Sequence, residues 1–482
     1  MGIVIEQSVK NTLSTYLGFA IGALNTLVFY THFMNASNYG IVALLLSIAT
    51  LSAPFLLVGS QQLLIRYYPN FSDKGSIISF SLLIPIFMSI LIGVGLMCFQ
   101  YQLINFIQND SNLPRYFLWY VFSIAVSMAF FEYFYALSRV AYKTVSGNFL
   151  KEVAHRLLIA FGLVAYFYEF LTFNGFMLLL VMIYALRMIV MFTYSLLLVP
   201  FKLSLSFTFS IKPLLVYALV LFMGSVAALI ILEVDKIMIH QYLDLRQVAY
   251  YTVGVFIATL VAVPYRAMHQ ITLPITAKFI ADKNDVGLKN LYKQSSINLS
   301  IVTGLVLVLL LVNIDALYSF LPEDYHNALW VVYILGIAKF IDASLGINNA
   351  IVTNASFYAY VLGFGMLLGI MTVVFNMWLL PRYGVEGAAY ASLIALTIYN
   401  LLKLILVLIN FKMHPYSWNT LLVILLSASV YFTVNQLVSV DHVVVDILVK
   451  SGLTLILYVG ITYKLKLSLS LNQLIHQLFK RV

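Results

Sequence analysis

Long apolar segments separated by short polar breaks follow one another along almost the whole of this 482-residue chain. A helix of about 20 apolar residues is long enough to cross the hydrocarbon core of a bilayer. The pattern predicts fourteen helices, at residues 12–34, 40–65, 77–99, 116–138, 149–171, 175–199, 213–239, 248–273, 296–314, 326–348, 357–380, 387–410, 418–437 and 443–463. Turn-forming residues occupy the breaks, as in NASNYG at 35–40 and PRYGVEG at 381–387. The predicted fold is therefore an all-α polytopic membrane protein.

The composition agrees with this pattern. Hydrophobic residues make up 62% of the chain and charged residues only 9%, whereas an ordinary soluble domain is about 25% charged. No stretch is polar enough to form a separate soluble domain, and the N-terminus lacks the basic start and cleavage site of a signal peptide. The single cysteine, Cys98, excludes an intramolecular disulfide and most cysteine metal sites.

Basic residues are distributed unevenly between the two sides of the membrane. Of 27 lysines and arginines, 19 fall on the side of both termini and five lie within predicted helices, whereas only Arg115, Arg246 and Arg382 fall on the opposite side. Cytoplasmic loops of membrane proteins carry an excess of Lys and Arg, so we expect both termini to be cytoplasmic. The net charge of +9 follows from the same bias, because the basic residues are scattered in short loops and form no nucleic-acid-binding patch.

A faint internal repeat suggests how the helices are organised. Residues 32–51 and 241–260 align without gaps at an offset of 209, and both end in IATL. Because 209 residues hold six predicted helices, the two repeats should have the same orientation in the membrane. We therefore expect two six-helix lobes related by a pseudo-two-fold axis along the membrane normal. The predicted divisions are 1–200, 201–411, the last two helices at 412–463, and a cytoplasmic amphipathic tail at 464–482. In this tail one helical face holds Leu471, Leu474, Ile475 and Leu478.

The chain carries no recognisable catalytic motif. It has no H-E-x-x-H zinc helix, no G-x-x-x-x-G-K-[ST] phosphate-binding loop and no G-x-S-x-G nucleophile elbow. The loops on the outer side are too short to hold a folded domain that would act on sugars there. We therefore predict a transporter rather than an enzyme, with no cofactor and no metal site.

The segment EVDKIMIH places Glu233, Asp235 and Lys236 at the end of a long apolar run. A charge in the bilayer core costs several kcal/mol unless it has a partner or water. Asp235 lies almost opposite Glu233 around the helix, so one face cannot hold all three. Either Glu233 and Lys236 form an i,i+3 pair at the membrane interface, or Asp235 or Lys236 reaches a central aqueous cavity.

Two helices carry stripes of small or polar residues: Ser14, Gly18, Gly22 and Asn25 in 12–34, and Lys339, Asp342, Gly346 and Asn349 in 326–348. The first stripe contains G-x-x-x-G, so it either packs closely on another helix or lines a cavity. In the second stripe, Lys339 and Asp342 either neutralise each other or face a functional site.

Arg187 and Glu132 lie inside predicted helices with no opposite charge within four positions. Each needs a partner from another helix, a lipid headgroup or a ligand. A basic group lies at the cytoplasmic ends of two neighbouring helices, formed by Arg139, Lys143, Lys151 and Arg156. This group either anchors the helices under the positive-inside rule or attracts a phosphate-bearing lipid.

Four segments resemble one family when they are taken in order. They are NYGIVALLLSIATL near the start, GSQQLLIRYYPNF at 59–71, DKIMIHQYLDLRQVAYYTVG at 235–254 and NMWLLPRYGVEGAAYASLIA at 376–395. The chain resembles bacterial polysaccharide-unit transporters, the Wzx-type flippases of the multidrug/oligosaccharidyl-lipid/polysaccharide (MOP) superfamily, over nearly its whole length.

This resemblance implies that the protein moves an undecaprenyl-pyrophosphate-linked oligosaccharide across the bacterial inner membrane by alternating access, for O-antigen, capsule or exopolysaccharide synthesis. Positive charge for the pyrophosphate would come from Arg187, Lys236 and Lys339, and from the cytoplasmic residues Arg139, Lys143 and Arg156. Hydrogen bonds to the sugars would come from Asn25, Gln61 and Gln270. A coupling Na⁺ or H⁺ would bind Asp235, Asp342 or Glu132. The implied partners are the lipid-linked glycan, membrane lipids, a polysaccharide polymerase and a chain-length regulator.

Three alternatives stay open. A cation-coupled multidrug antiporter of the same superfamily is expected to have twelve helices and acidic rather than basic cavities. A membrane-embedded polymerase or glycosyltransferase is expected to show a large outer loop, which this chain lacks. A structural membrane subunit leaves the charge of Arg187 unexplained.

Overall fold

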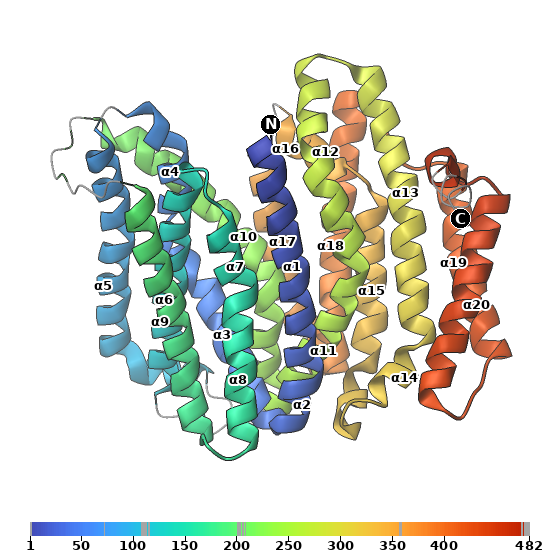
Figure 1. The fold of residues 1–482 in the computed structure, drawn as a ribbon, viewed down its shortest axis with the longest axis horizontal. Coiled ribbons are helices and arrows are strands. Elements are labelled where there is room, and N and C mark those ends of the chain that lie inside the picture. The colour runs from blue at the N-terminus through green and yellow to red at the C-terminus, as the bar shows by residue number, and fades with distance from the viewer. Residues whose placement is uncertain are drawn as a thin grey trace. The chain divides into compact units, whose positions relative to one another are not determined.

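The computed structural model describes residues 2–71, 73–107, 113, 116–199, 204, 207, 209–355, 359–473 and 476. Over these residues the regular structure is helical throughout, and a helix occupies each of the fourteen predicted ranges (Figure 1). Twelve helices are long and apolar enough to span a membrane, and the bent helix at 211–242 makes a thirteenth. The helix in the predicted range 149–171 carries Lys151, Glu152 and Arg156 and is not among them. The all-α polytopic class is confirmed, and the count of fourteen spans stays a prediction.

The chain divides into two compact units, Met1–Thr252 and Val253–Val482. The first contains α1 (Gly2–Leu24), η1 (Asn25–Phe29), α2 (Tyr30–Phe33), α3 (Ala36–Leu57), α4 (Ser60–Tyr67), η2 (Tyr68–Asn70), α5 (Lys74–Ile107), α6 (Phe117–Val140), α7 (Val145–Phe149), η3 (Leu150–Ala154), α8 (His155–Phe167), α9 (Phe173–Leu198) and α10 (Ile211–Tyr242). Helix α11 (Leu245–Ala258) contains the boundary. Within this unit α6 packs against α9, α3, α4 and α5, and α3 also packs against α10.

The second unit continues with η4 (Thr259–Ala262), α12 (Val263–Ala281), α13 (Asp285–Val312), α14 (Ile314–Tyr318), η5 (Glu323–Ala328), α15 (Leu329–Ser344), α16 (Asn348–Asn354), α17 (Ala359–Tyr383), α18 (Val385–Phe411), α19 (Trp418–Leu437) and α20 (Val443–Lys464). Here α13 packs against α12, α15, α19 and α20, and α18 packs against α15, α16 and α17. The predicted lobe boundaries at residues 200 and 411 stay predictions.

Side-chain caps explain where several helices begin. The Asn35 side chain accepts a hydrogen bond of 2.8 Å from the Asn38 amide at the start of α3, and Thr172 accepts one of 3.2 Å from Gly175 at the start of α9. Such caps satisfy backbone N–H groups that have no partner inside the helix. The predicted helix 40–65 is interrupted, because Val58 and Gly59 adopt positive φ angles of 43° and 73° between α3 and α4. The turn residues in the sequence thus mark real helix ends.

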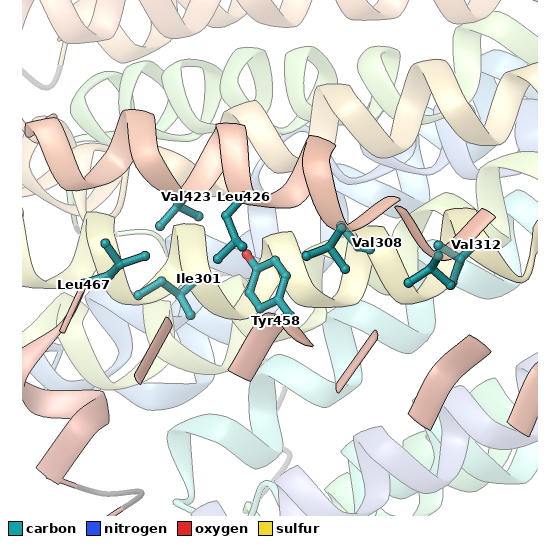
Figure 2. Close-up of a cluster of buried hydrophobic side chains, with 9 residues drawn as sticks. Ile301, Val308, Val312, Val423, Leu426, Tyr458 and Leu467 are labelled. Atoms are coloured by element: carbon teal, nitrogen blue, oxygen red, sulfur yellow. The ribbon is translucent and has the colours of Figure 1, made fainter. Parts of the chain in front are cut away.

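The last two long helices, α19 and α20, share an apolar core with α13 (Figure 2). Buried members of this core include Ile301, Val308, Val423, Leu426 and Tyr458. Of the predicted tail face, Leu471 packs against the core, whereas Leu474, Ile475 and Leu478 lie outside the described residues.

Gly304 on α13 makes the close approach of α20 possible, and replacing it should destabilise this unit. A Cβ atom built on Gly304 would lie 2.5 Å from the Tyr458 hydroxyl, so Gly304→Ala should cost about 1–3 kcal/mol and lower the melting temperature in detergent. Adding Tyr458→Phe should restore part of the loss. Gly452→Ala is the matched control, because nothing lies within 4 Å of a Cβ there. No recovery in the double variant would show that this contact does not limit the packing.

Candidate functional site

The G-x-x-x-G stripe of α1 packs against α7, η3 and α8 (Figure 1). A Cβ built on Gly18 would overlap the backbone of Glu152, and one built on Gly22 would lie 3.0 Å from Nη1 of Arg156. Small residues let membrane helices approach this closely. Of the two interpretations of this stripe, the structure supports helix packing at Gly18 and Gly22.

Asn25 and Arg156, both predicted to bind substrate, meet at this packing contact. The Asn25 side chain donates a 2.8 Å hydrogen bond to the Arg156 carbonyl, and the guanidinium donates to the Gly18 carbonyl. Arg156 also pairs with Glu152 at 3.3 Å. The Oδ1 atom of Asn25 is buried and has no partner among the described residues. Two π-helical segments, η1 and η3, begin at Asn25 and Leu150 next to this contact, and such segments are frequent at functional sites.

Glu132 on α6 acquires two partners from the basic group. Its carboxylate lies 2.5 Å from Lys151 Nζ and 3.7 Å from the Arg139 guanidinium. Arg139 also lies over the Tyr135 ring, 4.1 Å from its centroid. Lys143 is exposed. Of the four residues in the predicted basic group, three are therefore engaged with a carboxylate.

Arg187 on α9 is buried, with 9% of its surface exposed. Its guanidinium lies over the rings of Phe131 and Tyr184, at 4.3 Å and 4.8 Å from their centroids. It forms no ion pair with any residue that the structure describes, and its Nε has no hydrogen-bond partner there. Glu132 and Glu152 lie within electrostatic range of it.

These charged residues form one set, which we call the Arg187 cluster: Arg139, Lys151, Arg156, Arg187, Glu132 and Glu152. Four basic groups accompany two carboxylates, an excess of two positive charges; Arg187 is buried, whereas the side chains of Arg139 and Lys151 are 36% and 40% exposed. From the sequence, five of these residues were predicted as site residues or as members of the cytoplasmic basic group, but the sequence could not show that they lie together. It did not single out Glu152, Tyr184 or His155, whose buried ring lies 5.9 Å from that of Tyr184.

The EVDKIMIH segment on α10 separates its three charges as the helical geometry requires. Glu233 and Lys236 form the predicted i,i+3 pair at 2.6 Å. Asp235 is 3% exposed and accepts a 2.5 Å hydrogen bond from the Tyr251 hydroxyl. Glu233 and Lys236 also line a cavity of ≈ 160 Å³ within the first unit. The pair therefore forms, and Lys236 also lines this cavity of the first unit, whereas the central aqueous cavity stays a prediction.

In the second unit, Asp342 on α15 lies within electrostatic range of Lys403 on α18 and of Tyr265 and His269 on α12. Lys403 is only 3% exposed, and its Nζ lies 4.2 Å from the centroid of the Tyr399 ring. We call Asp342 and Lys403 with these neighbours the Asp342 site. Lys403 is one of the five basic residues inside predicted helices, but the sequence did not lead us to propose it as a site residue.

Three further predicted residues are not among those named for the Arg187 cluster or the Asp342 site. Lys339 is partly buried on α15, three residues before Asp342. Gln61 is partly buried on α4, and its Oε1 has no partner among the described residues. Gln270 is exposed on α12. Over the described residues, no three His, Cys, Asp or Glu side chains gather as a possible metal site.

Comparison with solved structures shows which known proteins share this fold. No family model and no curated protein matches the chain. A structure described as the lipid II flippase MurJ in an inward closed conformation matches with a TM-score of 0.72 and 15% identity, over 96% of this chain and 99% of that one. An inward-facing MATE multidrug resistance transporter of the MOP superfamily matches with a TM-score of 0.65 and 14% identity, over 83% and 94%. A Vibrio cholerae MATE transporter matches with a TM-score of 0.55 and 14% identity, over 84% and 96%. The chain is thus a multi-pass membrane protein with the fold of MOP-superfamily transporters.

Proposed function

We propose that the protein is a flippase that moves an undecaprenyl-pyrophosphate-linked oligosaccharide across the cytoplasmic membrane of a bacterium during polysaccharide synthesis. Both termini lie in the cytoplasm under this proposal, and the two halves of the chain open alternately to each side. A polymerase and a chain-length regulator would act on the translocated unit.

The observation that carries this proposal is the positive excess of the Arg187 cluster. A pyrophosphate crossing a bilayer needs compensating positive charge, because a bare charge in the membrane core is costly. Arg187 suits this role, since its guanidinium is buried without an ion pair among the described residues and presents several donors to phosphate oxygens. The fold shared with a structure described as a lipid II flippase is consistent with a lipid-linked substrate.

A cation-coupled multidrug antiporter is the second candidate, because the fold also matches MATE transporters. A cationic substrate requires a carboxylate that is free to bind it. In the first unit, Glu132, Glu152 and Glu233 each pair with a basic residue, as does Asp446 in the second. Asp342 lies near Lys403, and Asp235 is buried and accepts a hydrogen bond from the Tyr251 hydroxyl. This balance of charge favours an anionic substrate.

The proposal is tested with purified protein in proteoliposomes that contain a fluorescent undecaprenyl-pyrophosphate glycan. We expect protein-dependent movement of the glycan between leaflets, measured by quenching from one side, and the assay repeated with Na⁺ and H⁺ gradients identifies the coupling ion. A parallel set of vesicles is loaded with a cationic dye. Gradient-driven dye efflux without glycan movement would establish the antiporter instead.

A further inference from the structure

We propose that the cavity beside the Glu233–Lys236 pair binds one neutral sugar ring of the transported glycan, the ring attached to the pyrophosphate. This inference rests on the proposed function, which supplies the sugar. The cavity measures ≈ 160 Å³ and lies within the first unit, between η1, α2, α3, α10 and α11. A space of this size suits a single sugar ring.

Hydroxyl groups dominate the polar lining of this cavity. They belong to Thr26, Tyr30, Tyr39, Ser47, Thr50 and Thr252. Thr50 and Thr252 donate hydrogen bonds of 2.7 Å and 2.6 Å to carbonyls of their own helices, so their oxygens remain able to accept. A hydroxyl both donates and accepts, which matches the hydroxyls of a sugar ring.

Two of these hydroxyls are buried without a partner. The Tyr30 side chain is 6% exposed and Ser47 is 1% exposed, and neither oxygen has a hydrogen-bond partner among the described residues. Buried polar groups in native proteins are nearly always hydrogen-bonded. Both side chains line the cavity, so rotation of either one would bring its hydroxyl to a polar occupant.

The charges in the lining favour a neutral occupant. Glu233 and Lys236 lie 2.6 Å apart and neutralise each other, so neither a metal ion nor an anion would find an uncompensated charge. Their remaining lone pairs and protons can still form charge-assisted hydrogen bonds with hydroxyl groups. The stacked rings of Tyr30 and Tyr39, with centroids 4.6 Å apart, add apolar surface beside these polar groups.

The position of the cavity relates it to the Arg187 cluster. Tyr184 lies 4.8 Å from the Arg187 guanidinium, and it is within electrostatic range of both Tyr30 and Glu233. Under the proposal, a pyrophosphate held near Arg187 extends its first sugar toward the cavity. This arrangement gives the Glu233–Lys236 pair a function inside the membrane.

The test measures binding of two lipid classes to the purified protein by native mass spectrometry. The probes are undecaprenyl-pyrophosphate alone and undecaprenyl-pyrophosphate carrying one glucose, galactose, N-acetylglucosamine or N-acetylgalactosamine. For the unaltered protein we expect at least one sugar to improve the affinity about tenfold. The double variant Ser47→Ala/Thr50→Val, and separately Ala43→Leu, which fills the cavity, should abolish this gain and leave the affinity for undecaprenyl-pyrophosphate unchanged.

Ser127→Ala is the matched control, because Ser127 is a buried serine on α6 that does not line the cavity. It should keep the full gain. A gain that persists in both cavity variants, or that no sugar produces in the unaltered protein, would overturn the sugar site while leaving the proposed function intact. Failure of the unaltered protein to bind any of these lipids would overturn the proposed function and the sugar site with it.

Discussion

Replacing Arg187 with alanine should lower the rate of glycan translocation by at least about tenfold while the protein still folds and inserts. Loss of a hydrogen bond to a charged group costs about 1.5–3 kcal/mol, and 1.4 kcal/mol corresponds to a factor of ten. Arg187 carries a buried charge with no ion pair among the described residues, so its removal deprives the substrate of a counter-charge and breaks no salt bridge of the fold. The measurement is the initial rate of glycan movement in proteoliposomes.

Two further variants separate charge from geometry. Arg187→Lys keeps the charge but loses the planar guanidinium, so we expect an intermediate rate. Arg382→Ala is the matched control, because Arg382 also lies over an aromatic ring, 4.8 Å from the Trp378 centroid, but is exposed. It should transport at the unaltered rate. Full activity in Arg187→Ala would eliminate the role of the Arg187 cluster in substrate binding.

The sequence predicted the helices well because each is specified locally. A run of about 20 apolar residues is recognisable without any knowledge of its neighbours. The caps at Asn35 and Thr172 are likewise local, since each side chain bonds an amide three residues later. The i,i+3 pair of Glu233 and Lys236 was predictable for the same reason.

Contacts between helices could not be predicted in this way. Glu132 binds Lys151, which lies 19 residues away on another helix. The spacing of residues along the sequence does not predict which face of α6 contacts η3. The hydroxyls of Tyr30 and Ser47, which have no hydrogen-bond partner among the described residues, become informative only when α2 and α3 line a shared cavity. The π-helical segments η1 and η3 carry no sequence signal that we recognised.

Lys403 shows how a local rule can mislead. It lies eight residues before the end of α18, Val385–Phe411, where a lysine would ordinarily extend its side chain to the interface. The structure instead buries it against Tyr399 and near Asp342. Its position inside a helix was a sufficient signal to propose it as a site residue.

Replacing Lys403 with methionine should both destabilise the protein and abolish transport. The substitution removes the positive neighbour of Asp342, and removing one partner of a fully buried ion pair costs about 3–5 kcal/mol. Because Asp342 is only partly buried and forms no ion pair with Lys403 within 4.0 Å among the described residues, the loss should be smaller than this range. The melting temperature in detergent and the translocation rate are measured together.

The double variant Lys403→Met/Asp342→Asn distinguishes folding from transport, because it removes both charges and leaves neither uncompensated. We expect it to recover most of the melting temperature but to remain inactive if Asp342, one of the three carboxylates that the resemblance implies for ion coupling along with Asp235 and Glu132, is the one that couples. The matched control is Asp446→Asn/Lys450→Met, which removes a second acid–lysine pair, 2.8 Å apart on α20 of the same unit, and should leave transport unchanged. If the Asp342 double variant transports at the unaltered rate under the same ion gradient, the Asp342 site serves only the fold, and the coupling carboxylate must be sought at Asp235 or Glu132.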